Sequence, residues 1–253
     1  QTCALPISFN CPINELFDWH KREKILERIT PPWDKIRVLE RKYDDSIFLK
    51  NGKIILSQEL LPFIKLNWKL LHKNYHEGKS FEDVLIAGPL KSWVHKHEFK
   101  KITDNKTIIN DQISFTHWIN FKKLNDFTIK NMEKSFNYRR KIIEYDISNQ
   151  YNNPEGKFVI ISGGTGLVGS DLIPMLNSLG YKILILKFNV HSDNDFGITD
   201  KTIEQENIIT INWNPYSSKT IKIPQFISEK IEYLVNLSGE NILGIWTKSK
   251  KNS

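Results

Sequence analysis

The sequence predicts two domains in succession: an α+β domain in which an antiparallel sheet wraps around one long helix, and an α/β domain with a parallel sheet covered by helices. Short strand-like runs separated by turns fill most of the first half, and apolar residues then recur at helical spacing over 123–147. The strand-like runs of the last part are continuously apolar, as in strands buried on both faces. A polar stretch with Pro154 and Gly156 separates these patterns and places the domains at 8–150 and 157–253.

The first domain is expected to begin with two short helices between Pro12 and Ile29, because Pro31 and Pro32 cannot continue a helix. Strands are expected at 35–41, 46–49, 53–60, 65–75, 80–87, 93–101 and 107–115. The long helix that follows has one apolar face, formed by Ile129, Met132, Phe136, Ile143 and Ile147.

Composition excludes several classes of protein. The chain has 253 residues, 40% of them hydrophobic, and no run approaches the ~18 consecutive apolar residues of a membrane span. Two cysteines, Cys3 and Cys11, are too few for a disulfide framework, so we expect a reducing, cytoplasmic compartment. The net charge of +7 resides in residues 1–150, where lysines and acidic residues are interleaved, so no nucleic-acid partner is expected.

Both ends of the sequence have unusual features. Residues 1–7 (Gln-Thr-Cys-Ala-Leu-Pro-Ile) resemble the translated end of a common short-read sequencing adapter, so they are expected to add nothing to the fold. The chain also stops at Ser253, shortly after a motif described below. We therefore expect the sequence to be a gene fragment whose second domain is incomplete.

Residues 162–169, with the sequence Ser-Gly-Gly-Thr-Gly-Leu-Val-Gly, follow a buried strand directly and open a helix. Gly163 permits a tight turn, Gly166 lets the backbone approach a pyrophosphate, and Gly169 lets the helix pack close to the strand. A second strand follows Gly180, so the pattern predicts a Rossmann-type βαβ unit that binds NAD or NADP. The cofactor contacts expected in this turn are Gly163, Gly164, Thr165, Gly166, Leu167, Val168 and Gly169.

The end of the second strand distinguishes the two cofactors. An acidic residue there binds the ribose hydroxyls of NAD, whereas a basic residue accepts the 2′-phosphate of NADP. This chain has Lys187 at that position and no acidic residue before Asp193, which favours NADP over NAD. A lysine that is merely solvated remains the alternative.

Three further segments accompany the glycine turn: residues 212–215 (Asn-Trp-Asn-Pro), 235–242 (Val-Asn-Leu-Ser-Gly-Glu-Asn-Ile) and 246–247 (Trp-Thr). In this order they resemble the extended short-chain dehydrogenase/reductase superfamily, and within it the NAD(P)-binding proteins related to sugar-nucleotide epimerases. The resemblance covers residue 157 to the end of the chain.

This resemblance implies that Asn236, Ser238 and Gly239 lie beside the ribose and nicotinamide of the cofactor. Local turn chemistry is the alternative role of Asn236 and Ser238. The sequence departs from the family at Phe188, where relatives commonly have arginine. The Tyr-x-x-x-Lys segment used for proton transfer does not occur after Gly169, so no catalytic residue is assigned.

The first half resembles the START/SRPBCC-type (helix-grip) domain that is fused ahead of such epimerase-like domains. The resemblance rests on residues 16–20, 26–33, 88–99 and 136–140. It implies a curved sheet gripping a long helix, with an apolar cavity between them for a hydrophobic ligand.

Trp93, His95 and His97 alternate along the strand at 93–101 and therefore share one face, expected to line that cavity. Either the histidines are polar contacts for a ligand, or they are hydrogen-bonded core residues, which we favour. No third ligand occurs at a suitable spacing, so no metal is expected.

Together these patterns predict an NAD(P)-dependent epimerase/dehydratase-like oxidoreductase with an N-terminal domain of the hydrophobic-ligand-binding type. Its substrate is expected to be a small molecule such as a nucleotide sugar, and the fragment itself is expected to bind dinucleotide without catalysis. The alternative is a non-catalytic regulatory protein, related to cell division, that binds a cofactor or a lipid.

Overall fold

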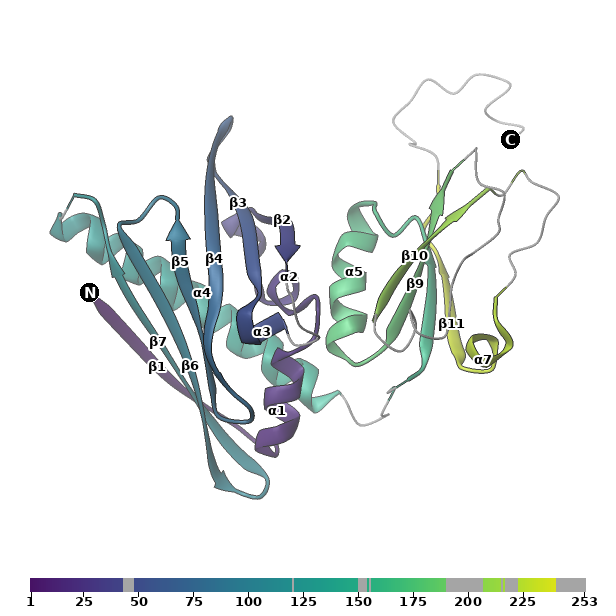
Figure 1. Ribbon diagram of the computed structural model, residues 1–253, viewed down its shortest axis with the longest axis horizontal. Helices are drawn as coiled ribbons and strands as arrows, with labels where there is room; N and C mark the ends of the chain where they lie inside the picture. Colours follow the sequence, from purple (N-terminus) through teal and green to yellow (C-terminus); the bar gives the residue numbers. More distant parts are fainter. Residues whose placement is uncertain are drawn as a thin grey trace. The chain divides into compact units, whose positions relative to one another are not determined.

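The computed structural model describes residues 1–42, 48–119, 121–149, 154, 156–189, 207–214, 216 and 223–239. The chain divides into two compact units, the first comprising Gln1–Pro154 and the second beginning at Glu155, with Asn177–Gly180 grouped with the first. Each unit contains one sheet, antiparallel in the first and parallel in the second (Figure 1). This mixed architecture confirms the predicted order of an antiparallel followed by a parallel sheet.

The antiparallel sheet has seven strands in the order β1-β7-β6-β5-β4-β3-β2. These are β1 (Thr2–Phe9), β2 (Ile36–Lys42), β3 (Lys53–Leu61), β4 (Ile64–His76), β5 (Ser80–Ala87), β6 (Ser92–Thr103) and β7 (Lys106–Thr116). Short helices precede and interrupt them: α1 (Ile13–His20), α2 (Ile25–Ile29), the 3-10 turn η1 (Pro32–Asp34) and α3 (Phe48–Asn51). The strands from β3 to β7 follow one another along the chain through short connections, so this part of the sheet consists of consecutive hairpins.

The long helix α4 (Lys122–Ser148) crosses one face of this sheet (Figure 1). Phe136, with Ile129 and Met132 beside it, packs against Phe115 and Trp93 of the sheet. A second cluster near the carboxyl end of α4 joins the helices to the strands, and its fully or nearly fully buried members include Phe9, Leu16, Phe17, Trp19, Phe99, Ile109 and Ile143. The predicted helix at 123–147 and its apolar face are therefore confirmed.

Two local predictions for the first unit are wrong. Residues 48–51 form the helix α3 instead of part of a strand over 46–49, whose first two residues lie outside the described part of the chain. Residues 2–7, expected to add nothing, belong to β1, which pairs antiparallel with β7 from Thr2 opposite Ser114 to Phe9 opposite Thr107. Exposed and half-buried side chains alternate along β1, and Ile7 packs against the core on the inner face of the sheet. The segment can therefore pair at the edge of the sheet.

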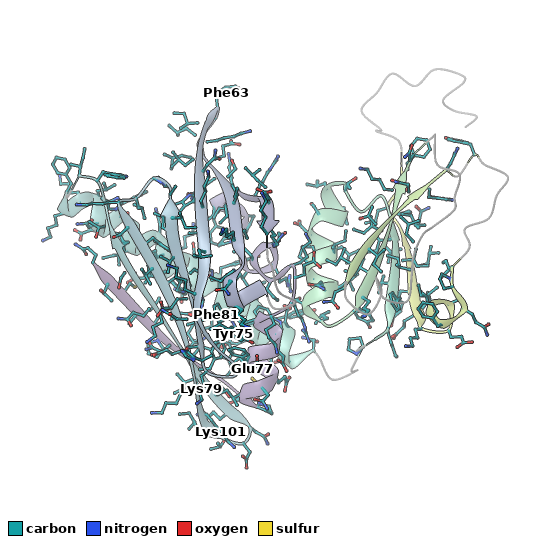
Figure 2. All side chains as sticks on the ribbon, in the orientation of Figure 1. Phe63, Tyr75, Glu77, Lys79, Phe81 and Lys101 are labelled. Carbon is teal, nitrogen blue, oxygen red and sulfur yellow. The ribbon has the colours of Figure 1, made fainter. Side chains whose placement is uncertain are left out.

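The hairpin between β3 and β4 projects beyond the sheet, with Phe63 at its tip (Figure 2). Phe63 is 99% exposed and has a positive φ of 72°. The turn imposes this backbone conformation, which residues other than glycine rarely adopt. Lys101 lies at the opposite end of the unit, and Phe81 and Tyr75 lie between the two ends (Figure 2).

The second unit has a four-stranded parallel sheet in the order β10-β9-β8-β11. Its elements are β8 (Phe158–Ser162), α5 (Leu167–Ser178), β9 (Lys182–Phe188), β10 (Ile208–Trp213), α7 (Gln225–Ser228) and β11 (Ile231–Asn236). Every residue of β8 is buried, as the continuous apolar run predicted. Successive side chains of β8 point to opposite faces of the sheet. Val159 and Ile161 pack with Ile173 of α5 on one face. Phe158 and Ile160 pack with Ile227 of α7 on the other.

Within the described part of the chain, no helix combines the length and the apolar character needed to cross a lipid bilayer.

Candidate functional site

The glycine turn between β8 and α5 is shaped by two close backbone contacts. Gly163 has a φ of +69°, and a Cβ there would lie 2.6 Å from the carbonyl carbon and oxygen of Leu237. A Cβ on Gly169 would lie 2.5 Å from the carbonyl oxygen of Gly164, because the first turn of α5 rests on the turn itself. Both positions therefore require glycine for reasons internal to the fold.

Gly166 differs from these two glycines. A Cβ added there would meet only the Gly163 carbonyl oxygen, at 3.3 Å, and its φ is not in the left-handed region. The residue is exposed, and so are its neighbours Thr165, Leu167 and Val168. The fold restricts Gly166 less than it restricts Gly163 or Gly169, and the backbone of Gly166 is exposed.

The tip of β11 lies beside this turn. Ser162 donates its hydroxyl to the Asn236 side-chain oxygen at 2.5 Å, and the backbone N–H of Ser238 donates to the same oxygen at 3.1 Å. The Asn236 oxygen is thus used in a local turn that joins β11 to β8. Gly239 has no atom within 4 Å of its hypothetical Cβ, and residues 240–242 and 246–247 of the motif lie outside the described residues.

Lys187 and Phe188 end β9, where they pair in register with Asn212 and Trp213 of β10. Both side chains are exposed, and the Phe188 ring meets the edge of Tyr216 at a centroid distance of 6.0 Å. Lys187 therefore lies at the carboxyl end of the parallel strands, the same end of the sheet as the glycine turn that follows β8.

A second candidate site lies on the face of the antiparallel sheet. Trp93 packs edge-on against Trp68, whereas His95 and His97, further along β6, are buried. Acidic partners come from the flanking strands, because Asp83 of β5 is opposite His95 and Asp111 of β7 is opposite His97. His72 of β4 is in turn opposite Asp83, and we call His72, Asp83, His95, His97 and Asp111 the His–Asp cluster.

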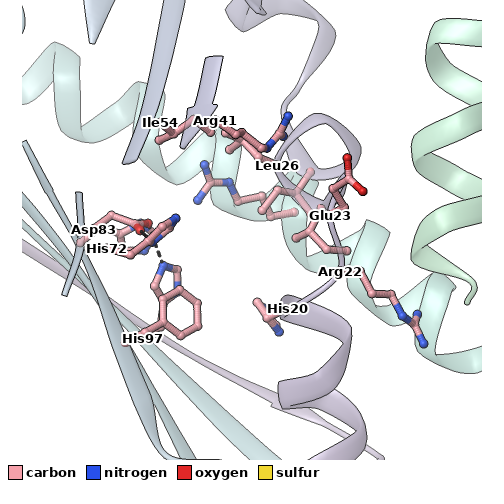
Figure 3. Close-up of a pocket in the computed structure, with 14 residues that line it drawn as sticks. His20, Arg22, Glu23, Leu26, Arg41, Ile54, His72, Asp83 and His97 are labelled. Carbon is pink, nitrogen blue, oxygen red and sulfur yellow. Dashed lines mark hydrogen bonds and ion pairs between the residues drawn. The ribbon is translucent and has the colours of Figure 1, made fainter. Parts of the chain in front are cut away.

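Short contacts connect the cluster. His72 Nδ1 lies 2.5 Å from Asp83 Oδ1, and His97 Nδ1 lies 2.6 Å from Asp111 Oδ1. His97 Nε2 bonds to Asp83 Oδ2 at 3.4 Å (Figure 3). His95 is held between the same two carboxylates, with Nδ1 3.9 Å from Asp83 Oδ2 and Nε2 3.5 Å from Asp111 Oδ1.

Burial and charge set the protonation of the cluster. Burial lowers the pKa of His97, but the adjacent Asp111 and Asp83 carboxylates outweigh it and raise that pKa to about 9. Burial and the charge on His97 together lower the pKa of His95 to about 4. Burial alone would raise the pKa of both carboxyl groups, yet the histidines hold them below their ordinary values.

A cavity of about 100 Å³ opens beside the cluster (Figure 3). Its polar lining includes His20 and Arg139, and its apolar lining includes Ile25, Ile29 and Ile54. The His20 Nδ1 bonds to the Leu16 carbonyl oxygen at 2.7 Å, and burial lowers the pKa of His20 to about 4. Ligand pockets for drug-sized molecules are roughly 300–1,000 Å³, so this cavity suits a much smaller occupant.

Sequence analysis singled out His95 and His97 but missed Asp83, Asp111 and His72. Asp111 occupies a buried position of β7, where burial alternates along the strand, whereas Asp83 lies on β5, where it does not. Their meeting depends on the register between strands, which the sequence pattern left undetermined. The expectation that no third metal ligand accompanies the two histidines therefore overlooked Asp83.

Neither a protein-family model nor a curated relative matches the sequence. The structure is similar to that of the nucleoside-diphosphate sugar epimerase from Corynebacterium glutamicum, with a TM-score of 0.66 and 23% identity over 99% of this chain. The chain spans 47% of the length of that protein. This likeness shows a shared fold across both units.

Two smaller proteins are similar to part of the chain. A START superfamily protein from Mycobacterium smegmatis has a TM-score of 0.44 and 8% identity, over 58% of this chain and 97% of its own. An aromatase/cyclase from Streptomyces sp. R1128 has a TM-score of 0.48 and 8% identity, over 60% of this chain and 95% of its own.

Proposed function

We propose that the second unit is a Rossmann-type domain that binds NADP or NAD, and that the whole protein is an epimerase-like oxidoreductase. The strand order β10-β9-β8-β11 supports this, because it corresponds to the order 3-2-1-4 of dinucleotide-binding sheets. In that topology the cofactor lies at the carboxyl ends of the strands, over the turn after the first strand.

The observation that carries the proposal is the contrast between Gly166 and two other glycines of the turn. Gly163 and Gly169 are required by contacts within the protein, but a Cβ on Gly166 would meet only one atom, at 3.3 Å. A turn with a purely structural role would have less need of glycine at this exposed position. Close approach of a pyrophosphate to the backbone supplies that need, and the start of α5 favours its negative charge.

Each remaining residue has a distinct part in the proposed site. Lys187, exposed at the end of β9, would accept the 2′-phosphate of NADP. Asn236 and Ser238 would border the nicotinamide side, with Asn236 also fixing the β11 turn through Ser162. When bound, the nicotinamide supplies hydride transfer.

The substrate class follows only by analogy. The Corynebacterium protein of similar fold is a nucleoside-diphosphate sugar epimerase, which supports a small-molecule substrate such as a nucleotide sugar. No described residue is assigned to proton transfer. We therefore expect residues 1–253 to bind cofactor without turning over a nucleotide sugar.

Calorimetric titration of the chain with NAD(H) and NADP(H) tests the cofactor site. Gly166→Val should abolish binding while leaving the thermal unfolding of the chain nearly unchanged, because the new side chain meets little besides Gly163 O. Absence of binding by the unaltered chain to all four nucleotides would assign the turn a structural role only.

The role of Lys187 is tested separately. Lys187→Ala should weaken NADP(H) and leave NAD(H) unaffected, because only NADP carries the 2′-phosphate. Lys182→Ala, which removes the lysine at the opposite end of β9, is the matched control and should weaken neither. Equal weakening of both nucleotides by Lys187→Ala would contradict the assignment of Lys187 to the 2′-phosphate.

A further inference from the structure

Three side chains of the His–Asp cluster converge on one point. Asp83, His95 and His97 each offer a ligand atom, and these atoms lie within 4.8 Å of one another. Asp83 Oδ2 is 3.4 Å from His97 Nε2 and 3.9 Å from His95 Nδ1. Bonds of ~2.0–2.2 Å in a tetrahedral zinc site place neighbouring ligand atoms roughly 3.3–3.5 Å apart. The Asp83–His97 distance already matches that geometry, the Asp83–His95 distance exceeds it by a few tenths of an ångström, and the two histidines would have to move closer together on binding.

We propose that Asp83, His95 and His97 bind a divalent first-row transition-metal ion of the Zn²⁺ class in the first unit. Two imidazoles and one carboxylate suit zinc or iron, whereas magnesium and calcium prefer sites made entirely of oxygen atoms. The ligands come from β5 and β6, two adjacent strands of a sheet, so their positions are fixed by the backbone pairing of Asp83 with His95.

The atoms on the far sides of these ligands also fit a metal site. Ligating histidines usually direct their second nitrogen at a carboxylate, which orients the ring and makes it a better ligand. His97 Nδ1 is 2.6 Å from Asp111 Oδ1, and His95 Nε2 is 3.5 Å from the same oxygen. The second oxygen of Asp83 is 2.5 Å from His72 Nδ1. Asp111 thus contacts both proposed histidine ligands, and His72 contacts the proposed ligand Asp83.

The alternative is an ion-pair network that is complete without a metal, and the bonding geometry argues against it. Among the described residues, Asp83 Oδ1, His95 Nε2, His97 Nδ1 and Asp111 Oδ1 are buried and have no hydrogen bond of acceptable geometry. Their contacts within the cluster are ion pairs between neighbouring side chains. Buried polar atoms left in this state cost about 1–3 kcal/mol each, which a bound cation that draws the rings into line would offset.

The site has room for a further ligand. Three protein ligands with an open position are typical of catalytic zinc sites, whereas structural sites are closed by four. The adjoining cavity of about 100 Å³ exceeds the ~30 Å³ share of one water molecule in the liquid. His20 lines the same cavity and presents a ring whose Nδ1 is already bonded to Leu16. The metal can therefore carry water or a small anionic ligand.

Titration of the metal-free full chain with Zn²⁺ and Co²⁺ tests the proposal. We expect one ion per chain and a tetrahedral or five-coordinate Co²⁺ absorption band. His97→Gln and Asp83→Asn should weaken binding more than about 100-fold, and Asp111→Asn about 10–100-fold, as is usual for outer partners. His76→Gln removes an exposed histidine of β4 and should change nothing. Binding that is lost in His76→Gln and kept in His97→Gln would overturn the site.

X-ray absorption of the Zn²⁺-loaded, unaltered chain keeps the test independent of variants that fail to fold. We expect two imidazole nitrogens and one or two oxygens at ~2.0–2.2 Å. A sulfur ligand would instead locate the ion at Cys3 or Cys11 and refute the assignment. Failure of the unaltered chain to retain one equivalent of Zn²⁺ would refute it as well.

Discussion

The candidate sites of the two sheets are built from different parts of the chain. In the parallel sheet, the candidate site is an edge made of backbone, where Gly166 offers no side chain to an approaching molecule. In the antiparallel sheet, it is a face made of side chains, where His95, His97 and Asp83 meet across neighbouring strands. An edge site is encoded in a few consecutive residues, whereas a face site is encoded by register between strands far apart in sequence.

The largest expected effect concerns charge burial in the first unit. Arg28 of α2 holds the fully buried Asp146 of α4 with two bonds, of 2.6 and 3.1 Å. Arg28→Met should destabilise the first unit by about 3–5 kcal/mol, because the carboxylate is left buried and unpaired. Arg140→Ala, which breaks the exposed pair with Glu144, is the control and should cost less than about 0.5 kcal/mol.

Urea unfolding followed by tryptophan fluorescence measures this difference, since five of the seven tryptophans belong to the first unit: Trp19, Trp33, Trp68, Trp93 and Trp118. Equal effects of the two substitutions would mean that the packing of α2 against α4 tolerates an unpaired buried charge.

The next effect tests the edge site. Gly169→Ala should destabilise the second unit by about 1–3 kcal/mol, because its Cβ would lie 2.5 Å from the Gly164 carbonyl oxygen, where only the backbone can give way. Gly166→Ala should cost less than about 1 kcal/mol, because its Cβ meets only Gly163 O at 3.3 Å. Protection of β8 and β9 from amide hydrogen exchange reports on both variants. A larger cost for Gly166→Ala would assign this glycine to the fold instead of to a ligand.

A smaller effect is the pH dependence of the first unit in the presence of a chelator. The raised pKa of His97, about 9, contributes stability that is complete below pH ~6.5 and is lost as the pH rises through 9. The lowered pKa values of His95 and His20, about 4, contribute stability that is complete above pH ~6.5 and is lost as the pH falls towards 4. The free energy of unfolding of the first unit should therefore be greatest at pH ~6.5, where both contributions are close to complete.

Midpoints of urea unfolding between pH 4 and 9 check this bell-shaped dependence. The carboxylates of Asp83 and Asp111 stay ionised across this range, because their pKa values are held below the ordinary value. Arg139 also faces the cluster and keeps its charge throughout. A midpoint that rises steadily up to pH 9 would show that His97 is neutral in the folded chain.

The smallest expected effect is a difference in thiol reactivity. Burial, with the Glu15 charge nearby, raises the pKa of Cys11 to about 12, and the side chain is 3% exposed. Cys3 is only partly buried, so it should react first with a thiol reagent at pH 8. Mass spectrometry should find one modified cysteine in the folded chain and two in urea. Modification of Cys11 before Cys3 would show that the segment between β1 and α1 opens more readily than its burial indicates.

Sequence patterns predicted most of the fold because its elements have strong local signals. The continuous apolar run of β8 and the helical spacing of Phe136 and Ile143 each follow from one segment alone. The helix α3 was missed because four residues carry little periodicity, and β1 because an unusual composition outweighed its alternating pattern. In both cases tertiary pairing decided the outcome.

The candidate sites divide in the same way. The glycine turn was predicted from seven consecutive positions. Gly163 has a positive φ, as a tight turn requires, and Gly169 packs against Gly164 of the turn itself. The His–Asp cluster was predicted only in part, because His95 and His97 share one strand. Asp83 and Asp111 come from its two neighbours. The pattern within one segment does not predict which residue of β5 pairs with which residue of β6.

The contact of Gly163 with Leu237 has a consequence for the order of folding. β8 and β9 are joined by the short α5 crossover, so they can pair early, whereas β8 and β11 meet across a separation of 74 residues, as Ser162 does with Asn236. Long loops close slowly, and the glycine turn reaches its final shape only when the Leu237 backbone is seated against it. We therefore expect the turn at the start of α5 to be completed late, after the chain has already formed most of its parallel sheet.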